Sequence, residues 1–218
     1  MLSYKKSMLT FVQVGRYSLV NLVCNDGVKR LVTQIKNYSD EVYQHSVNVA
    51  KVSVFIGILL GLGEEELQKI YNAGLLHDYG KLFIPQSILF KNGRLTDSEF
   101  AIMRTHVDCG VLALTDRDCV SKEVLKAISE HHEKIDGSGY PNHVTEISLI
   151  GKILAIADVY DALTNTRCYK NRCSVEYTLE QIKLGEGYEF DTESAEAFIH
   201  NQDSMLDYFN YKLNFDVG

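Results

Sequence analysis

The chain has 218 residues, with 22 Lys+Arg against 29 Asp+Glu and a formal net charge of −7 at pH 7. Its content of 45% hydrophobic and 23% charged residues is typical of a globular protein with one sizeable core, and it excludes disordered, collagen-like and low-complexity classes. The acidic balance argues against a protein that grips polymeric nucleic acid over a broad basic surface, but it leaves room for a local basic pocket.

Residues 1–38 lack the chemical motifs found later, and we expect a short helical appendage that packs on a main domain, residues 39–218. Gln13 and Arg16 interrupt the first apolar stretch and no small-residue cleavage site follows, so we predict no signal peptide. The longest apolar run, residues 52–62, is shorter than the ~20 residues that span a bilayer. The 5 cysteines form no C-x-x-C pair. We therefore predict a cytoplasmic protein without a membrane partner.

The chain has only 2 prolines and long stretches of three-to-four periodicity, which predict an all-α helical bundle. From Ser39 a helix is expected to continue to about Leu62, ended by the glycines around that residue. A second helix, 64–76, begins with acidic residues that suit a helix N-terminus. The sequence Thr96-Asp97-Ser98-Glu99 has the form of a capping box. We expect it to begin a single helix that includes residues 100–114. Further helices are expected at about 121–133, 148–164, 174–185 and 192–209.

Histidines are concentrated on these predicted helices or at their ends. Five of the 7 are placed in this way: His45, His77, His106, His131 and His132. Taken singly, each can be a partly buried histidine that bonds to a backbone carbonyl. Backbone hydrogen bonds explain the whole set less well, because every clustered imidazole needs a hydrogen-bond partner or a metal. An unsatisfied imidazole costs about 1–3 kcal/mol.

Carboxylates accompany the histidines. Glu41 lies four residues before His45, so both side chains share one helix face, although a surface pair has the same spacing. Asp78 directly follows the second histidine, and Lys81 comes about one turn later. Asp158 follows an apolar stretch, where an unpaired carboxylate is costly, so a metal, a base or a buried salt bridge is expected beside it.

This donor set predicts a metal centre. Imidazoles and carboxylates without thiolates suit Fe, Mn, Zn, Ni or Co better than Ca or Mg. The donors are too many for one ion, so we expect two or three metals that share a bridging carboxylate, with Asp78 as the best candidate for the bridge. Such a site lowers the pKa of a bridging water and holds phosphoryl oxygens for in-line displacement.

Four stretches then resemble the HD-GYP family, a branch of the HD phosphohydrolases. They are LLHDYGKLFIPQSIL, LTDSEFAIMRTHVDCG, ISEHHEKIDGSGYP, and ILAIADVYDALTNTRCYK with GEGYEFD after it. They cover roughly residues 39–200 in the order that the family has. The resemblance is specific because a string as long as HHE-x-x-DGSGYP rarely arises by chance.

The resemblance implies a helical bundle of the HD-domain type that hydrolyses cyclic di-GMP to pGpG, and often on to GMP, by a metal-bridging hydroxide. The metal ligands it implies are Glu41, His45, His77, Asp78, His106, His131, His132 and Asp158, with Glu41 accompanying a third metal. It implies catalytic roles for Asp78 and Lys81, and substrate contacts from Lys81, Gly139, Tyr140, Arg167 and Lys170. We expect Fe or Mn at this site, with Zn, Ni or Co as alternatives.

Other interpretations stay open. Arg167 and Lys170 can belong to a solvated charge cluster, Tyr140 can be a core tyrosine, and Lys81 can be a structural partner of the neighbouring aspartate. The segment after Pro141 is shorter than the usual family pattern, so hydrolysis of another cyclic dinucleotide is an alternative function. A further alternative function is that of a catalytically silent cyclic-dinucleotide receptor. We also expect that the protein can form a homodimer or bind a regulatory protein partner.

Overall fold

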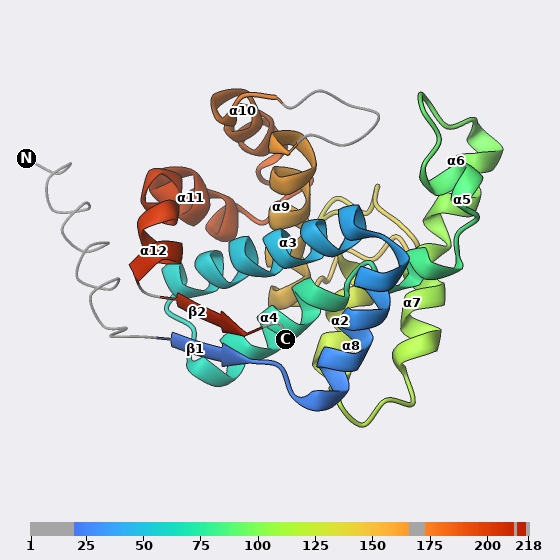
Figure 1. Cartoon of the computed structure of the whole chain (residues 1–218). Helices are drawn as coiled ribbons and strands as arrows, with labels where there is room; N and C mark the ends of the chain where they lie inside the picture. Colours follow the sequence, from blue (N-terminus) through green and yellow to red (C-terminus); the bar gives the residue numbers. More distant parts are fainter. Residues whose placement is uncertain (1–19, 166–172, 212, 217–218) are drawn as a thin grey trace, which may run out of the picture.

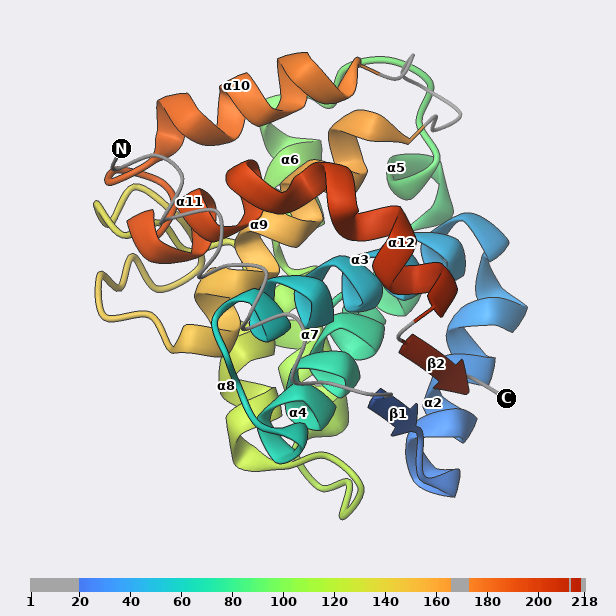
Figure 2. The same ribbon diagram turned by 90° about the vertical axis from the view of Figure 1, so that its left-hand side faces the viewer.

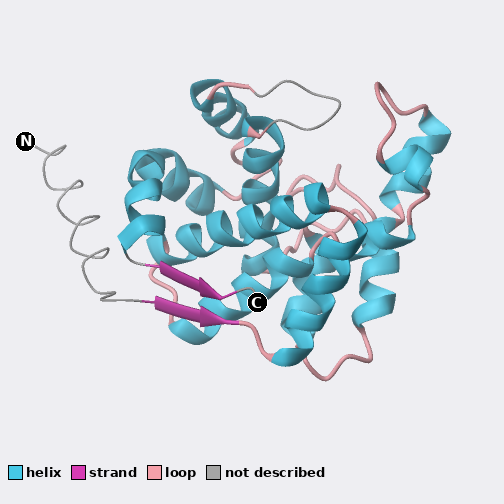
Figure 3. Ribbon diagram, in the orientation of Figure 1, coloured by secondary structure: helices cyan, strands magenta, loops and turns pink. Residues whose placement is uncertain are grey.

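The computed structural model describes residues 20–165, 173–211 and 213–216, and this part of the chain is mainly helical (Figures 1 and 3), which confirms the all-α prediction. The helices are α2 Asp26–Tyr38, α3 Asp40–Leu59, α4 Glu64–Leu76, α5 Gln86–Leu89, α6 Asp97–Arg104, α7 His106–Leu114, α8 Lys122–Glu130, α9 Leu149–Thr164, α10 Val175–Gly185, α11 Thr192–Asn201 and α12 Met205–Tyr211. Two 3-10 helices, η1 Tyr79–Phe83 and η2 Gln202–Ser204, and two strands, β1 Val20–Val23 and β2 Leu213–Asp216, complete the order.

Helix α3 lies at the centre of the bundle, between α4 and α9 (Figures 1 and 2). Its side chains are buried on several sides, and Val49, Phe55 and Ile56 have no exposed surface. Gly74 lets α4 approach α3 closely, because a Cβ atom at this position would lie 2.4 Å from the Cα of Ala50. This close contact brings the end of α4 to the beginning of α3, where the predicted ligands of both helices lie.

The capping box predicted at Thr96 is present, with reciprocal bonds between Thr96 and Glu99. The prediction of one continuous helix after it is wrong, because α6 ends at Arg104 and α7 begins at His106. The Thr105 hydroxyl donates to the carbonyl of Ile102 at 2.7 Å, a local bond that competes with the regular helical pattern. The break places His106 at the first position of a new helix.

The N-terminal region was expected to contain helices alone, and this prediction is wrong for residues 20–23. Strand β1 pairs in parallel with β2, with Val20 opposite Leu213 and Val23 opposite Asp216. Helix α2 follows as expected and packs on α3 and α4. A four-residue apolar run does not distinguish strand from helix, and the partner of β1 comes from the other end of the described chain. The domain boundary between residues 38 and 39 stays a prediction.

The C-terminal helix expected at 192–209 is also divided, into α11, η2 and α12. Among the described residues, no helix combines the length and the apolar character that a membrane crossing requires.

Candidate metal centre

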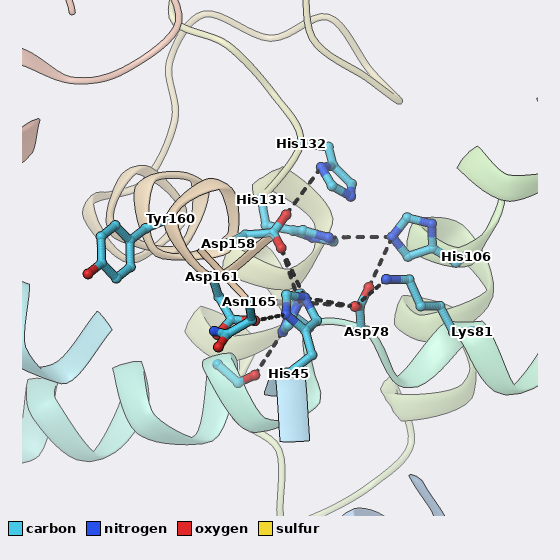
Figure 4. Close-up of polar contacts among 12 residues, drawn as sticks. His45, Asp78, Lys81, His106, His131, His132, Asp158, Tyr160, Asp161 and Asn165 are labelled. Atoms are coloured by element: carbon cyan, nitrogen blue, oxygen red, sulfur yellow. Dashed lines mark hydrogen bonds and ion pairs between the residues drawn. The ribbon is translucent and has the colours of Figure 1, made fainter. Parts of the chain in front are cut away.

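The predicted ligands converge from several helices onto one buried site (Figure 4). His45 comes from α3, His77 and Asp78 from the end of α4, His106 from the start of α7, His131 and His132 from the end of α8, and Asp158 from α9. Two neighbouring histidines can reach one site only where their helix ends. Helix α8 ends at Glu130, so the arrangement of His131 and His132 follows the predicted one.

The ligand atoms form two groups. One group consists of His45, His77 and Asp78, and the other of His106, His131 and His132. Within each group the ligand atoms all lie within 4.8 Å of one another. All of these residues are buried except His132, which is half-buried. Three converging imidazoles, or two with a carboxylate, are donors that suit a transition metal.

Asp78 lies between the two groups. Its Oδ2 atom is 3.3 Å from Nε2 of His45 and 3.3 Å from Nε2 of His77. Its Oδ1 atom is 3.4 Å from Nε2 of His106, and this buried oxygen accepts no hydrogen bond from the described residues. An unsatisfied buried carboxylate oxygen is unfavourable, and a cation between the groups would satisfy it. The position of Asp78 therefore fits the bridging role expected for it.

Asp158 has a similar two-sided arrangement. Its Oδ1 atom is 3.0 Å from Nε2 of His45, and its Oδ2 atom is 3.8 Å from Nδ1 of His132. The buried ion pair considered as an alternative for this carboxylate is therefore present, and one oxygen faces each group. Both carboxylates thus connect the two sets of histidines.

The orientation of three imidazoles is fixed by the backbone. Nδ1 of His77, His106 and His131 donates to the carbonyls of Gly74, Met103 and Ile128 at 2.8, 2.7 and 2.7 Å, because a carbonyl oxygen can only accept. A neutral ring held in this way presents a lone pair on Nε2. Burial lowers the pKa of both His106 and His131, and their Nε2 atoms lie 3.4 Å apart. Two facing lone pairs repel each other, and a metal ion between them would remove the repulsion.

His45 is held by a carboxylate instead. Its Nδ1 atom donates to Oδ2 of Asp161 at 2.6 Å, and Oδ1 of Asp161 accepts from Nδ2 of Asn165 at 2.5 Å. Burial alone would lower the pKa of His45, but hydrogen bonds to Asp158, Asp161 and Asp78 raise it to about 10. Asp161 is not among the residues predicted from the sequence. The pattern that points to it is a second carboxylate three residues after Asp158, in the same apolar helix.

Lys81 also reaches the site. Its Nζ atom donates to Oδ2 of Asp78 at 2.5 Å. Burial opposes ionisation of Asp78, but the charge of Lys81 holds the pKa of the carboxyl well below its usual range. The structural partnership considered for Lys81 is thus observed, and the same contact places its ammonium group at the predicted metal centre.

Tyr140 borders the site from the loop after α8. Its ring stacks on His132 with centroids 4.7 Å apart, and the guanidinium of Arg104 lies 4.5 Å from the ring centroid. The side chain is half-buried and is not enclosed in the core. At Gly139 a Cβ atom would lie 2.4 Å from the backbone nitrogen of Lys134, so only glycine allows the loop to pack here.

Two cavities adjoin the centre on the sides of Tyr140. One has a volume of about 230 Å³ and is lined by Lys81, Lys91, Phe100, Met103, His132 and Tyr140, among others. The other has a volume of about 330 Å³ and its lining includes Arg104, His132, Glu133, Lys134, Tyr140 and Asp158. Cationic side chains therefore lie beside the metal centre although the chain as a whole is acidic. This arrangement is the local basic pocket that the composition allowed.

One predicted metal ligand, Glu41, is not part of either ligand group. Glu41 lies in the first turn of α3, one turn before His45, and is half-buried. Arg167 and Lys170 lie outside the described residues, so their predicted phosphate contacts stay predictions.

The sequence matches the HD domain family over residues 30–193. It is 37% identical over 201 residues to 3'3'-cGAMP-specific phosphodiesterase 2 of Vibrio cholerae, covering 91% of this chain and 38% of that protein. It is 36% identical over 170 residues to a cyclic di-GMP phosphodiesterase of Pseudomonas aeruginosa, covering 77% of this chain and 41% of that protein. A cyclic di-GMP phosphodiesterase of Thermotoga maritima is 33% identical over 195 residues, which cover 88% of this chain and 53% of that one. The chain therefore spans only part of the length of these relatives.

Solved structures share the fold. An HDG"Y"P protein from Bdellovibrio bacteriovorus, Bd1817, superposes with a TM-score of 0.63 at 17% identity, covering 79% of this chain and 56% of that one. The HD domain of the phosphodiesterase PgpH from Listeria monocytogenes, in complex with cyclic-di-AMP, gives a TM-score of 0.62 at 15% identity, covering 86% of this chain and 99% of that one. At these identities the likeness concerns the fold alone.

Proposed function

Because the chain belongs to the HD domain family, in its HD-GYP branch, we propose that it is a metal-dependent phosphodiesterase that hydrolyses cyclic di-GMP to pGpG, with cleavage on to GMP as a second step. The observation that carries this proposal is the pair of ligand groups with Asp78 between them. The names of the relatives support a cyclic dinucleotide as the substrate. One of these relatives is named for 3'3'-cGAMP, which favours that dinucleotide as the second candidate.

The site residues have different proposed roles. His45, His77 and Asp78 would hold one metal, and His106, His131 and His132 another, with Asp158 facing both groups. When bound, such metals supply a water of lowered pKa and offset the charge of phosphoryl oxygens. The ammonium of Lys81 would donate to a phosphate oxygen, and a donor held there favours the charge that develops in the transition state.

We favour Fe or Mn for the metals, with Zn, Ni or Co as alternatives, since the donors are imidazoles and carboxylates. We also propose a cytoplasmic location. In the described part of the chain Cys109, Cys119 and Cys173 form no disulfide, which supports a reducing compartment. A homodimer or a regulatory partner protein stays a prediction.

An anaerobic assay tests the function. The protein is loaded with Fe(II) or Mn(II) and incubated with cyclic di-GMP, and the products are separated by chromatography. We expect pGpG or GMP from the loaded protein and neither from the same sample after treatment with a chelator. Binding of intact cyclic di-GMP by a metal-replete protein without any product would instead identify a receptor.

Glu41 tests the number of metals. We propose a third metal at this end of α3, and Glu41→Ala is then expected to lose one metal equivalent and much of the activity while the protein stays folded. Elemental analysis and the hydrolysis rate, measured on the same sample, check this result. Glu64→Ala, which removes an exposed glutamate from the first turn of α4, is the control. Equal metal content in the wild type and Glu41→Ala would contradict the trinuclear proposal.

Asp161 is expected to position His45 for a metal. Asp161→Asn removes the charge that orients the imidazole, so metal affinity should fall roughly 10- to 100-fold, as for other changes behind a ligating histidine. Competition with a metal-binding dye measures the affinity without reference to activity. Asp116→Asn, at an exposed aspartate, is expected to leave the affinity unchanged. Unchanged affinity in Asp161→Asn would remove this positioning role.

A further inference from the structure

One of the two cavities extends from the metal centre toward α5 and α6, which project together from the bundle (Figure 1). Lys81, His106 and His132 line it beside the centre, and Lys91 and Gly93 line it on the segment between α5 and α6. The remaining lining is mainly apolar and consists of Ile88, Leu89, Leu95, Phe100, Met103 and Tyr140. Two cationic donors, Lys81 and Lys91, thus line a largely apolar cavity of about 230 Å³. This lining suits a flat ring that carries a hydrogen-bond acceptor and is attached to an acidic group.

Phe100 supplies an aromatic surface for such a ring. Its side chain is 47% exposed, although it lies on the cavity wall. Its ring meets Tyr140 edge to face, with centroids 6.3 Å apart. A base placed against Phe100 would cover this apolar surface, and base–aromatic contacts of this kind contribute to affinity with little regard to which base is bound.

Lys91 supplies a donor on the segment between α5 and α6. Its Nζ atom donates to Oε1 and Oε2 of Glu99 at 2.8 and 2.6 Å. Oε2 of Glu99 also accepts from the backbone nitrogen of Thr96 at 2.7 Å. An ammonium group carries three hydrogens, so Glu99 orients Lys91 and leaves one hydrogen for a ligand.

We propose that this cavity holds a guanine of the substrate and that Lys91 recognises it, an inference that rests on the proposed function. Guanine presents two acceptors, O6 and N7, on one edge, whereas adenine has an amino donor in the place of O6. An ammonium group donates only, so Lys91 favours guanine, whose edge has two neighbouring acceptors, over adenine, whose N7 acceptor lies beside an amino donor. Lys81, which lines the same cavity beside the metal centre, then lies near the phosphate attached to that nucleoside.

The second cavity is less selective. Arg104 and Lys134 line it with donors, and Glu133 and Glu189 line it with acceptors. Oε2 of Glu133 is buried and accepts no hydrogen bond from the described residues, while Oε1 accepts from the backbone nitrogen of Asn142 at 2.6 Å. The free oxygen can accept from the amino group of either adenine or guanine. This side of the site therefore admits both bases.

Together the two cavities predict which cyclic dinucleotides are the better substrates. Cyclic di-GMP and 3'3'-cGAMP each bring a guanine to Lys91, whereas cyclic di-AMP has none. In 3'3'-cGAMP mainly one of the two phosphodiester bonds then faces the metal centre, because the Lys91 cavity favours the guanine and the adenine is left for the second cavity. Its hydrolysis is expected to give one linear dinucleotide in large excess over its sequence isomer.

The experiment compares kcat/KM on the three dinucleotides for the metal-loaded wild type and Lys91→Met, which keeps the aliphatic stem and removes the donor. We expect cyclic di-AMP to be the poorest wild-type substrate. Lys91→Met should lower kcat/KM on cyclic di-GMP and 3'3'-cGAMP roughly 10- to 100-fold, mainly through KM, and leave cyclic di-AMP unchanged. Lys183→Met is the matched control, since it removes the exposed Lys183–Glu186 pair of α10. Sequencing of the linear product by mass spectrometry checks the cleavage of 3'3'-cGAMP.

Three results would overturn the inference. One is an equal loss on all three dinucleotides, which would make Lys91 a structural brace for Glu99. The second is an unchanged preference in Lys91→Met, and the third is a mixture of both linear isomers from 3'3'-cGAMP. If the wild type hydrolyses nothing, the proposed function fails, but calorimetric binding still tests the cavity. Tighter binding of cyclic di-GMP than of cyclic di-AMP, lost in Lys91→Met, would support the inference, and equal binding would contradict it.

Discussion

Replacement of Asp78 by Asn is expected to remove at least one metal and to lower the rate of cyclic di-GMP hydrolysis roughly 10³-fold or more. The change keeps the shape of the side chain and removes its charge. Asp78 has one oxygen toward His45 and His77 and the other toward His106, so this single change affects both ligand groups. An amide in this position turns one oxygen into a donor that cannot bind a metal. Elemental analysis and kcat, measured on one sample, check the result.

The effect of this change on folding has to be separated from its effect on the metals. Asp78 is almost fully buried and pairs with Lys81, so its loss also affects stability. Thermal unfolding of the metal-free variant measures that part. Asp78→Glu keeps the charge and is expected to retain more metal than Asp78→Asn. Full metal content and full activity in Asp78→Asn would exclude Asp78 as the bridge.

Replacement of Lys81 by Ala is expected to lower kcat roughly 10²-fold while the metal content is kept. The ammonium group lies at the metal centre, 2.5 Å from Oδ2 of Asp78, and lines the cavity beside it. A donor in this position stabilises charge that develops on a phosphate oxygen, so the loss falls mainly on kcat. Single-turnover rates with metal-loaded protein measure the chemical step.

The alternative role of Lys81 gives a different result. If the lysine only balances the charge of Asp78, Lys81→Ala changes metal affinity or thermal stability and leaves the turnover of the fully loaded enzyme intact. Lys69→Ala, which removes the surface pair with Glu65 on α4, serves as the control. Unchanged turnover in Lys81→Ala would remove this residue from the mechanism.

The parts that sequence predicted best are those in which a residue type implies its own chemistry. A buried imidazole or carboxylate needs a partner, so His45, His77, His106 and Asp158 could be assigned to one site before their distances were known. Local rules also worked, as at Thr96, where the capping box and the start of α6 were both predicted. The helical class follows from periodicity in the same way.

The remainder depended on contacts between distant segments. The pairing of β1 with β2 joins the two ends of the described chain, and neither short strand has a pattern that predicts its partner. Nothing in the sequence distinguishes Asp161 from another carboxylate on α9, and its role becomes visible only in the fold, where it bonds to His45. The same holds for Lys91, whose significance comes from the cavity that α5 and α6 form beside the metal centre.

We propose that two or more metals occupy the His/Asp cluster with Asp78 between them. Anomalous diffraction from crystals grown with Mn(II) tests this proposal most directly. We expect two peaks about 3.5–4 Å apart, both ligated by Asp78, one beside His45 and His77 and the other beside His106 and His131. A single peak held by one group alone, or peaks outside the cluster in a metal-replete protein, would contradict this account.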